Sequence, residues 1–266
     1  MIQPQPQPVQ PVIFVGHGSP DTLLSSTVTP AAWRRIGEQF HPNKILCISA
    51  HWESETPTVS TVAKPDLIYD FSGFPKALYQ MKYPVAGDPS LGHRVREVLR
   101  QADIPCRESA TRGIDHGAWC VLKAMYPEAD IPVVQLSLQP SRGPEWHLRL
   151  GRALGPLRRE GVLILCSGAI THNFDWVLFD QPHGAPLPQA TAFADWVADR
   201  VAHADHGALV DYRRLAPRGA EAHPTEEHFL PLFVALGASG DEIPRRVAPE
   251  TLYGGLCMDC YVIGGA

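Results

Sequence analysis

The stretch Val12-Ile13-Phe14-Val15-Gly16-His17-Gly18-Ser19-Pro20 joins a short apolar run to a turn that contains two glycines and a proline. Four consecutive apolar residues bounded by turn residues are typical of a strand that is buried on both faces. The turn begins at once after this run, so the strand carries His17 to the edge of the sheet at which it ends. The stretch therefore predicts a buried strand that presents a histidine.

The same arrangement occurs twice more along the chain. The apolar run at 44–49 is followed by His51, and the run at 162–166 is followed by Ser167-Gly168 and then His172. A further apolar run lies at 132–138. Segments with helical spacing lie between and after these runs, at 90–102, 118–125, 145–160, 189–202 and 226–236. Strands that alternate with helices predict an α/β fold, with a single domain built on a central, largely parallel sheet covered by helices.

Length and composition agree with one folded enzyme domain. The chain has 266 residues, 44% of them hydrophobic and 19% charged. We expect residues 1–11 to form a disordered Pro/Gln tail and residues 12–266 to form the catalytic domain. The tail lacks the basic and apolar regions of a signal peptide, so we expect a cytoplasmic protein.

The charge pattern excludes two classes of partner. The formal net charge is −5, and the sequence contains no run of Lys and Arg. Nucleic acids and anionic membrane surfaces both require clustered positive charge. We therefore expect no nucleic acid partner and no membrane partner, while the sequence gives no indication of the oligomeric state.

Histidines at the strand ends indicate a metal site. Ligands of parallel α/β sheets bind outside the carboxyl ends of the strands, and neutral imidazole is a common protein ligand for Fe and Zn. Three histidines placed alike, His17, His51 and His172, are therefore candidate ligands. Two further candidates are His116, which follows Asp115 before a helix, and His228, which we expect inside the helix at 226–236. Asp115 is also in a position to cap the helix that follows it.

Six short motifs occur in an order that resembles a known enzyme family. They are Gly16-His17-Gly18-Ser19-Pro20, Ser49-Ala50-His51-Trp52, Asp70-Phe71-Ser72-Gly73-Phe74-Pro75, Gly113-Ile114-Asp115-His116-Gly117, Ser167-Gly168 with Thr171-His172-Asn173, and Pro224-Thr225-Glu226-Glu227-His228-Phe229-Leu230-Pro231. Together they resemble the class III extradiol ring-cleavage dioxygenases of the protocatechuate 4,5-dioxygenase superfamily, and more narrowly its 4,5-DOPA dioxygenase branch.

The resemblance implies an Fe(II)-dependent enzyme that opens the ring of a DOPA-like catechol with O2 to give a semialdehyde. It implies His17, His51 and His228 as metal ligands, although better-known members use a glutamate as the third ligand, a position open here to Glu226 or Glu227. A set of three histidines also suits Zn(II).

Further roles are implied for residues around the metal. His172 is either a fourth ligand or the base that removes a phenolic proton, and His116 is the acid that protonates the departing oxygen. Asp115 is expected to raise the basicity of His116 or to orient a neighbour. We expect Ser19 and Asn173 to position the substrate, because they stand beside the histidines of these motifs, and Trp52 to line an aromatic substrate pocket.

Two other functions use the same histidines. The first is a zinc-dependent hydrolase or amidase, in which zinc-bound hydroxide attacks and Glu53 or Glu227 acts as the base. The compact H-E-x-x-H motif of many zinc peptidases is absent from the sequence. The second is a non-catalytic metal-binding protein. Consumption of O2 in the presence of a catechol separates the dioxygenase from both.

Overall fold

A six-stranded sheet forms the centre of the protein, in the strand order β5-β2-β6-β1-β10-β7. Its strands are β1 (Val12–Gly16), β2 (Lys44–Ser49), β5 (Val133–Gln135), β6 (Val162–Gly168), β7 (Arg245–Val247) and β10 (Cys260–Ile263). The four strands β5, β2, β6 and β1 run parallel, whereas β10 pairs antiparallel with β1. The sheet is therefore largely parallel, with an antiparallel partner on one side of β1.

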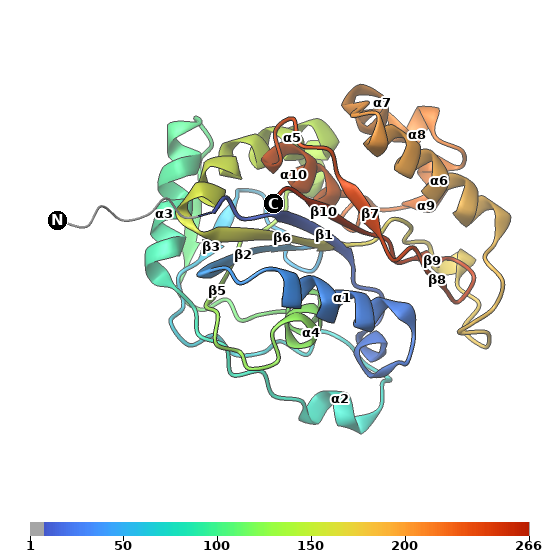
Figure 1. Cartoon of the computed structure of the whole chain (residues 1–266), viewed down its shortest axis with the longest axis horizontal. Helices are drawn as coiled ribbons and strands as arrows, with labels where there is room; N and C mark the ends of the chain where they lie inside the picture. The colour runs from blue at the N-terminus through green and yellow to red at the C-terminus, as the bar shows by residue number, and fades with distance from the viewer. Residues whose placement is uncertain (1–7, 266) are drawn as a thin grey trace.

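Helices cover both faces of this sheet in the computed structural model, which describes residues 8–265. Helices α5 and α10 lie over one face, and α1 and α4 lie over the other (Figure 1). The helices are α1 (Val28–Gln39), α2 (Lys76–Gln80), α3 (Pro89–Gln101), α4 (His116–Met125), α5 (Gly143–Leu154), α6 (Pro188–Ala202), α7 (His206–Val210), α8 (Tyr212–Leu215), α9 (Gly219–Ala222) and α10 (Leu230–Ala238). The α/β class predicted from the sequence is confirmed.

Short elements complete the fold around the sheet. Two small sheets pair β3 (Thr58–Ser60) with β4 (Arg107–Ser109) and β8 (Thr251–Leu252) with β9 (Leu256–Cys257). Four 3-10 helices are η1 (Pro20–Leu24), η2 (Pro140–Arg142), η3 (Gly155–Glu160) and η4 (Phe174–Trp176). The elements that follow strand ends, above all η1 and η4, border the functional edge of the sheet.

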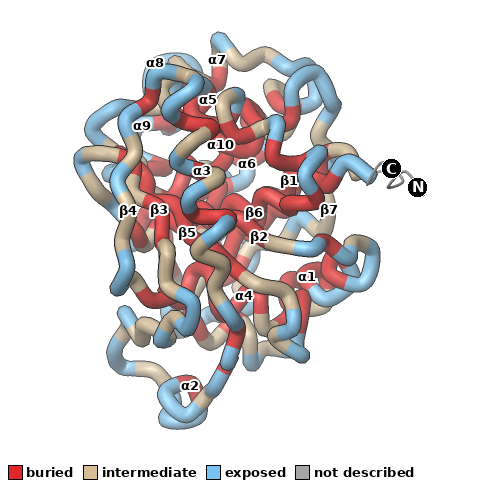
Figure 2. The backbone as a smooth tube through the Cα atoms, turned by 90° about the vertical axis from the view of Figure 1, so that its left-hand side faces the viewer, coloured by how far each residue is buried: buried red, intermediate tan, exposed pale blue. Residues whose placement is uncertain are grey.

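The core is divided into two layers by the sheet. Side chains of alternate strand residues enter opposite layers, so Phe14 packs with the α5 and α10 layer while Ile13 and Val15 pack with the α1 and α4 layer. Figure 2 shows the strands buried at the centre and the exposed residues concentrated in outer turns and helices. Burial on both faces explains why these strands are continuous apolar runs.

The structure describes the start of the chain from residue 8 onward. Residues 1–7 of the expected tail are outside the described residues. The backbone N–H of Gln10 donates to the carbonyl of Arg158 at 3.1 Å, and Nε of Arg158 donates to the carbonyl of Gln10 at 2.7 Å. Among residues 8–265, no helix is long and apolar enough to cross a bilayer.

Candidate active site

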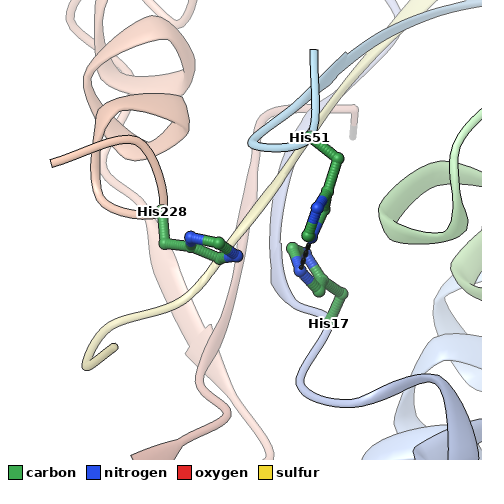
Figure 3. A group of neighbouring side chains, drawn as sticks. All are labelled: His17, His51 and His228. Carbon is green, nitrogen blue, oxygen red and sulfur yellow. Dashed lines mark hydrogen bonds between the residues drawn. The ribbon is translucent and has the colours of Figure 1, made fainter. Parts of the chain in front are cut away.

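Three histidines from distant parts of the chain meet at the ends of the parallel strands. His17 follows β1, His51 follows β2, and His228 lies two residues before α10. One ring nitrogen from each lies within 4.8 Å of the others, and Figure 3 shows the three rings turned toward one another. We call His17, His51 and His228 the histidine cluster. It brings together the three residues that the resemblance implied as metal ligands.

A hydrogen-bond chain fixes the orientation of the His17 ring. The hydroxyl of Ser167 donates to the carbonyl of Gly117 at 2.5 Å. Its oxygen is therefore left to accept a hydrogen bond from Nδ1 of His17 at 3.0 Å. Nδ1 therefore carries the hydrogen, and Nε2 presents a lone pair to the cluster. This is the tautomer that a metal ligand requires.

Carboxylates lie against the outward nitrogens of the other two rings. Nδ1 of His228 is 2.9 Å from Glu227, and Nδ1 of His51 is 3.5 Å from Asp70. A carboxylate accepts the Nδ1 hydrogen and leaves Nε2 as the inward lone pair.

The inward nitrogens lie at the spacing of ligands that share a cation. Nε2 of His17 is 3.0 Å from Nε2 of His51, and two lone pairs at this distance repel unless a cation or a proton lies between them. Two imidazoles bound to one metal, each at about 2.1 Å, lie at a similar separation. The donor set and its geometry fit a metal ion.

Two glycines allow the cluster to be this compact. A Cβ on Gly117 would lie 2.6 Å from Oγ of Ser49 and 2.9 Å from Cδ2 of His51. A Cβ on Gly168 would lie 2.2 Å from the carbonyl of His228. Backbone of α4 and β6 therefore approaches the histidines more closely than any residue with a side chain permits.

Burial keeps the cluster histidines neutral. Burial is the largest cause that lowers the pKa of His51 to about 4, and the neighbouring His116 lowers it further. Burial also holds the pKa of His17 and of His228 well below its usual value, followed by the nearby histidines, of which His51 has the largest effect on His17 and His172 the largest effect on His228. A neutral imidazole keeps its lone pair, so all three rings remain competent to bind a metal at neutral pH.

Asp70 is the functional residue that the sequence did not single out. Its carboxylate accepts hydrogen bonds from the backbone N–H and from Nδ1 of His116, at 3.1 and 2.9 Å. Burial raises the pKa of Asp70, but the side-chain hydrogen bond and the charge of His116 outweigh it and bring the pKa to about 2. An ionised carboxylate thus links His116 to His51. Its place in the Asp70-Phe71-Ser72 motif was the one available signal.

His172 lies beside the cluster. Its ring stacks on that of His228, with centroids 3.5 Å apart and planes within 9°. Its Nδ1 is 3.7 Å from Glu227. Ligand atoms of His172, Glu227 and His228 lie within 4.8 Å of one another, in a set that does not include His17 and His51. Burial lowers the pKa of His172, and the charge of Glu227 opposes that shift.

Asp115 lies beneath the site and does not face the substrate pocket. It is fully buried and caps α4 by accepting from the N–H of Ala118. Its carboxylate also accepts from Ser49 at 2.6 Å, Gln135 at 2.9 Å and Arg112 at 3.0 Å. The carboxylate beside His116 is Asp70, so Asp115 contributes packing and helix capping under the cluster.

Of the three residues expected to contact the substrate, one borders the pocket and two do not. Ser19 borders the pocket above the cluster, whereas Trp52 and Asn173 are not among its lining residues. Trp52 is buried beneath the guanidinium of Arg112, 5.0 Å from the ring centroid, and Asn173 donates to the carbonyl of Glu221. Both residues support the surrounding backbone.

A pocket of about 530 Å³ opens directly above the cluster. His17, His51 and His228 form its floor, together with His116 and His172. Its walls are mainly aromatic and aliphatic; they include Phe71, Phe74, Phe174, Val177, Phe179, Tyr253, Leu256 and Met258. This volume and this lining suit a small aromatic ligand placed with its polar end on the histidines.

Comparisons with known proteins identify the family of this chain. The family model of the catalytic LigB subunit of aromatic ring-opening dioxygenase matches residues 14–258. The chain is 39% identical to a 4,5-DOPA dioxygenase extradiol of Beta vulgaris, over 93% of this chain and 94% of that protein. It is 38% identical to a protein of the same name from Escherichia coli K12, over 96% and 94% of the two chains.

A solved structure extends the likeness to the fold. An uncharacterised protein of Escherichia coli K12 superposes with a TM-score of 0.80 at 34% identity, covering 96% of this chain and all of that one. The family match spans all three residues of the histidine cluster. The chain belongs to the family of the catalytic LigB subunit of aromatic ring-opening dioxygenases, and it is an extradiol ring-cleavage dioxygenase.

Proposed function

We propose that the protein binds Fe(II) through His17, His51 and His228 and cleaves the ring of a DOPA-like catechol with O2. The observation that carries this proposal is the convergence of three imidazole lone pairs on the floor of an aromatic-walled pocket. Relatives over nearly the whole chain are named 4,5-DOPA dioxygenase extradiol, which supports the substrate class.

Iron is favoured by the reaction, although the three-histidine set also suits zinc. Three protein ligands leave coordination positions for both oxygens of a catechol and for O2. When bound, Fe(II) would supply the redox chemistry that joins O2 to an electron-rich diol. Glu227 contacts Nδ1 of His228, so we assign the third ligand position to His228 and an orienting role to Glu227.

His172 serves as the base in this proposal. Its lowered pKa keeps the ring neutral and able to take a phenolic proton. It lines the pocket and stacks on the ring of His228, so it lies next to a substrate that reaches the cluster.

His116 serves as the acid, and Asp70 positions it. Asp70 accepts the Nδ1 hydrogen of His116, which turns Nε2 toward the pocket that His116 lines. Nε2 is therefore the atom from which His116 would deliver a proton to the oxygen that leaves. Ser19, on the pocket wall, is placed to contact the substrate's side chain.

Anaerobic metal exchange tests the proposal. The metal is removed, Fe(II) or Zn(II) is added without O2, and L-DOPA is mixed in before O2 is admitted. We expect a yellow ring-opened product and O2 uptake equal to the catechol consumed, with Fe(II) only. No O2 uptake across a panel of catechols, with hydrolysis of esters or amides under Zn(II), would overturn it.

A further inference from the structure

The walls of the pocket carry an unbalanced charge. Among its described lining residues, Asp21 is the one carboxylate, and no lysine or arginine is present. Asp70 and Glu227 are engaged with histidines behind the pocket floor. A ligand that enters the pocket therefore meets a single negative charge on the wall.

Asp21 is held in place and has no cationic partner. It lies on η1, four residues after His17, and is half-buried. The hydroxyl of Ser19 donates to its Oδ1, which restrains the carboxylate at the pocket that both residues line. Among residues 8–265, no lysine, arginine or histidine nitrogen lies within the 4.0 Å of an ion pair.

Aromatic rings lie close to this carboxylate. Tyr253 lines the pocket with Asp21, and its ring centroid is 6.5 Å from that of Phe179. Tyr253 has a φ of 51°, an unfavourable conformation for a residue other than glycine. Its N–H donates to the carbonyl of Pro182, and its carbonyl accepts from the N–H of Leu178. These bonds hold its ring at the pocket. Burial, followed by the negative charge of Asp21, raises the pKa of Tyr253.

A carboxylate beside one aromatic ring, in a pocket whose walls carry several others, is a site for an organic cation. An ammonium group gains from the opposite charge and from the faces of the rings. A carboxylate on the ligand would be repelled by Asp21 and would find no cation on the wall.

We propose that Asp21 selects catechols whose side chain bears a cationic amine, and that the pocket discriminates against catechols whose side chain bears a carboxylate alone. The inference rests on the proposed function, because it supposes that the diol end of the ligand lies on the histidine cluster. The side chain then extends from the opposite side of the ring toward η1 and the β8–β9 hairpin.

Steady-state kinetics of the Fe(II)-loaded protein test this selection. The probes are dopamine, L-DOPA and 3-(3,4-dihydroxyphenyl)propionate, which carry an amine, both groups and a carboxylate respectively. We expect kcat/KM to be higher for both amines than for the propionate, by about 10- to 100-fold, as expected for one desolvated charge contact.

Charge removal at Asp21 supplies the decisive comparison. Asp21→Asn should lower kcat/KM for both amines by about tenfold or more, leave the propionate unchanged or improved, and so abolish most of the preference. Asp180→Asn, which removes an exposed carboxylate outside the pocket lining, should keep the preference. An Asp21→Asn variant that lowers all three values equally, or a wild type that prefers the propionate, overturns the proposal.

A binding measurement separates this inference from the proposed function. Tyramine and 3-(4-hydroxyphenyl)propionate, which are not catechols, are titrated into the metal-free protein by calorimetry. We expect tighter binding of tyramine, with the difference lost in Asp21→Asn and in Asp21→Ser. If this difference appears but no catechol is cleaved, the proposed function fails and the amine site stands. If catechols are cleaved but neither kinetics nor binding shows a preference for the amine, the amine site fails and the proposed function stands.

Discussion

The floor and the rim of the same pocket are built in different ways. The centre of the floor is the histidine cluster, which is set on the ends of β1 and β2 and before α10, with each of its outward nitrogens next to a hydroxyl or a carboxylate. The rim, which we define as Asp21, Phe174, Phe179 and Tyr253, lies on short elements and turns, and Phe174 and Phe179 are 67% and 70% exposed.

We expect the floor to hold the metal and carry out the reaction, and the rim to select the substrate. Groups that hold a metal must keep their geometry within a fraction of an ångström, which a packed sheet edge provides. Loops tolerate change and carry specificity on a rigid scaffold. Changes on the floor should therefore remove metal or turnover, whereas changes on the rim should alter which substrate binds and how tightly.

The largest effect is expected from filling the space beside the floor. Gly117→Ala places a methyl group 2.6 Å from Oγ of Ser49 and 2.9 Å from His51, so the His51 ring must move. We expect loss of bound Fe(II), measured by metal analysis after loading, and loss of turnover. Gly207→Ala is the matched control, because its Cβ meets nothing closer than 3.9 Å. Full metal content in Gly117→Ala would contradict this account of the floor.

Removal of His172 tests whether the metal has three histidine ligands or four. His172→Ala should retain the metal and lose about 10²- to 10⁴-fold in kcat, the range for a general base. Metal content and single-turnover kinetics are the measurements. A parallel loss of metal would make His172 a ligand, and unchanged turnover would remove it from both roles.

Asp70→Asn tests a residue behind the floor that contacts no substrate in our proposal. The amide cannot take the Nδ1 hydrogen of His116 with the strength of a carboxylate, so we expect kcat to fall by about 10- to 100-fold. KM for the catechol should change little. Asp66→Asn, on a neighbouring segment outside the pocket lining, is the control. A change in KM alone would argue against positioning of His116.

The smallest effect is expected at the rim. Phe179→Ala removes an exposed ring, and partial loss of its contact with a ligand should raise KM about three- to tenfold, or roughly 1 kcal/mol. Metal content and kcat should stay at the wild-type level. A loss of metal in this variant would mean that floor and rim are not independent.

The sequence was sufficient to predict the floor wherever the signal was local. Strands β1 and β2 end where their apolar runs end, and both runs lead directly to a cluster histidine. The sequence therefore predicted that both histidines lie at the carboxyl edge of the sheet, where β1 and β2 each pair in parallel with β6 between them. Likewise, Asp115 does cap α4, which the sequence had left open.

Features that depend on tertiary contacts were missed or misplaced. The expected helix at 226–236 begins instead at Leu230, because Pro231 occupies its first turn; His228 therefore precedes the helix. Asp70 meets His116 across 46 positions of sequence, and no local pattern reveals such a pair.

The pairing of β1 with β10 has a consequence for biosynthesis. The strand that carries His17 is translated long before its antiparallel partner β10 and before Met258, which packs against Gly16 and Gly18. At ribosomal speeds the nascent β1 waits on the order of ten seconds or more for these contacts. Metal acquisition should therefore be a late step, and ribosome-stalled chains that stop before residue 228 should retain no Fe(II).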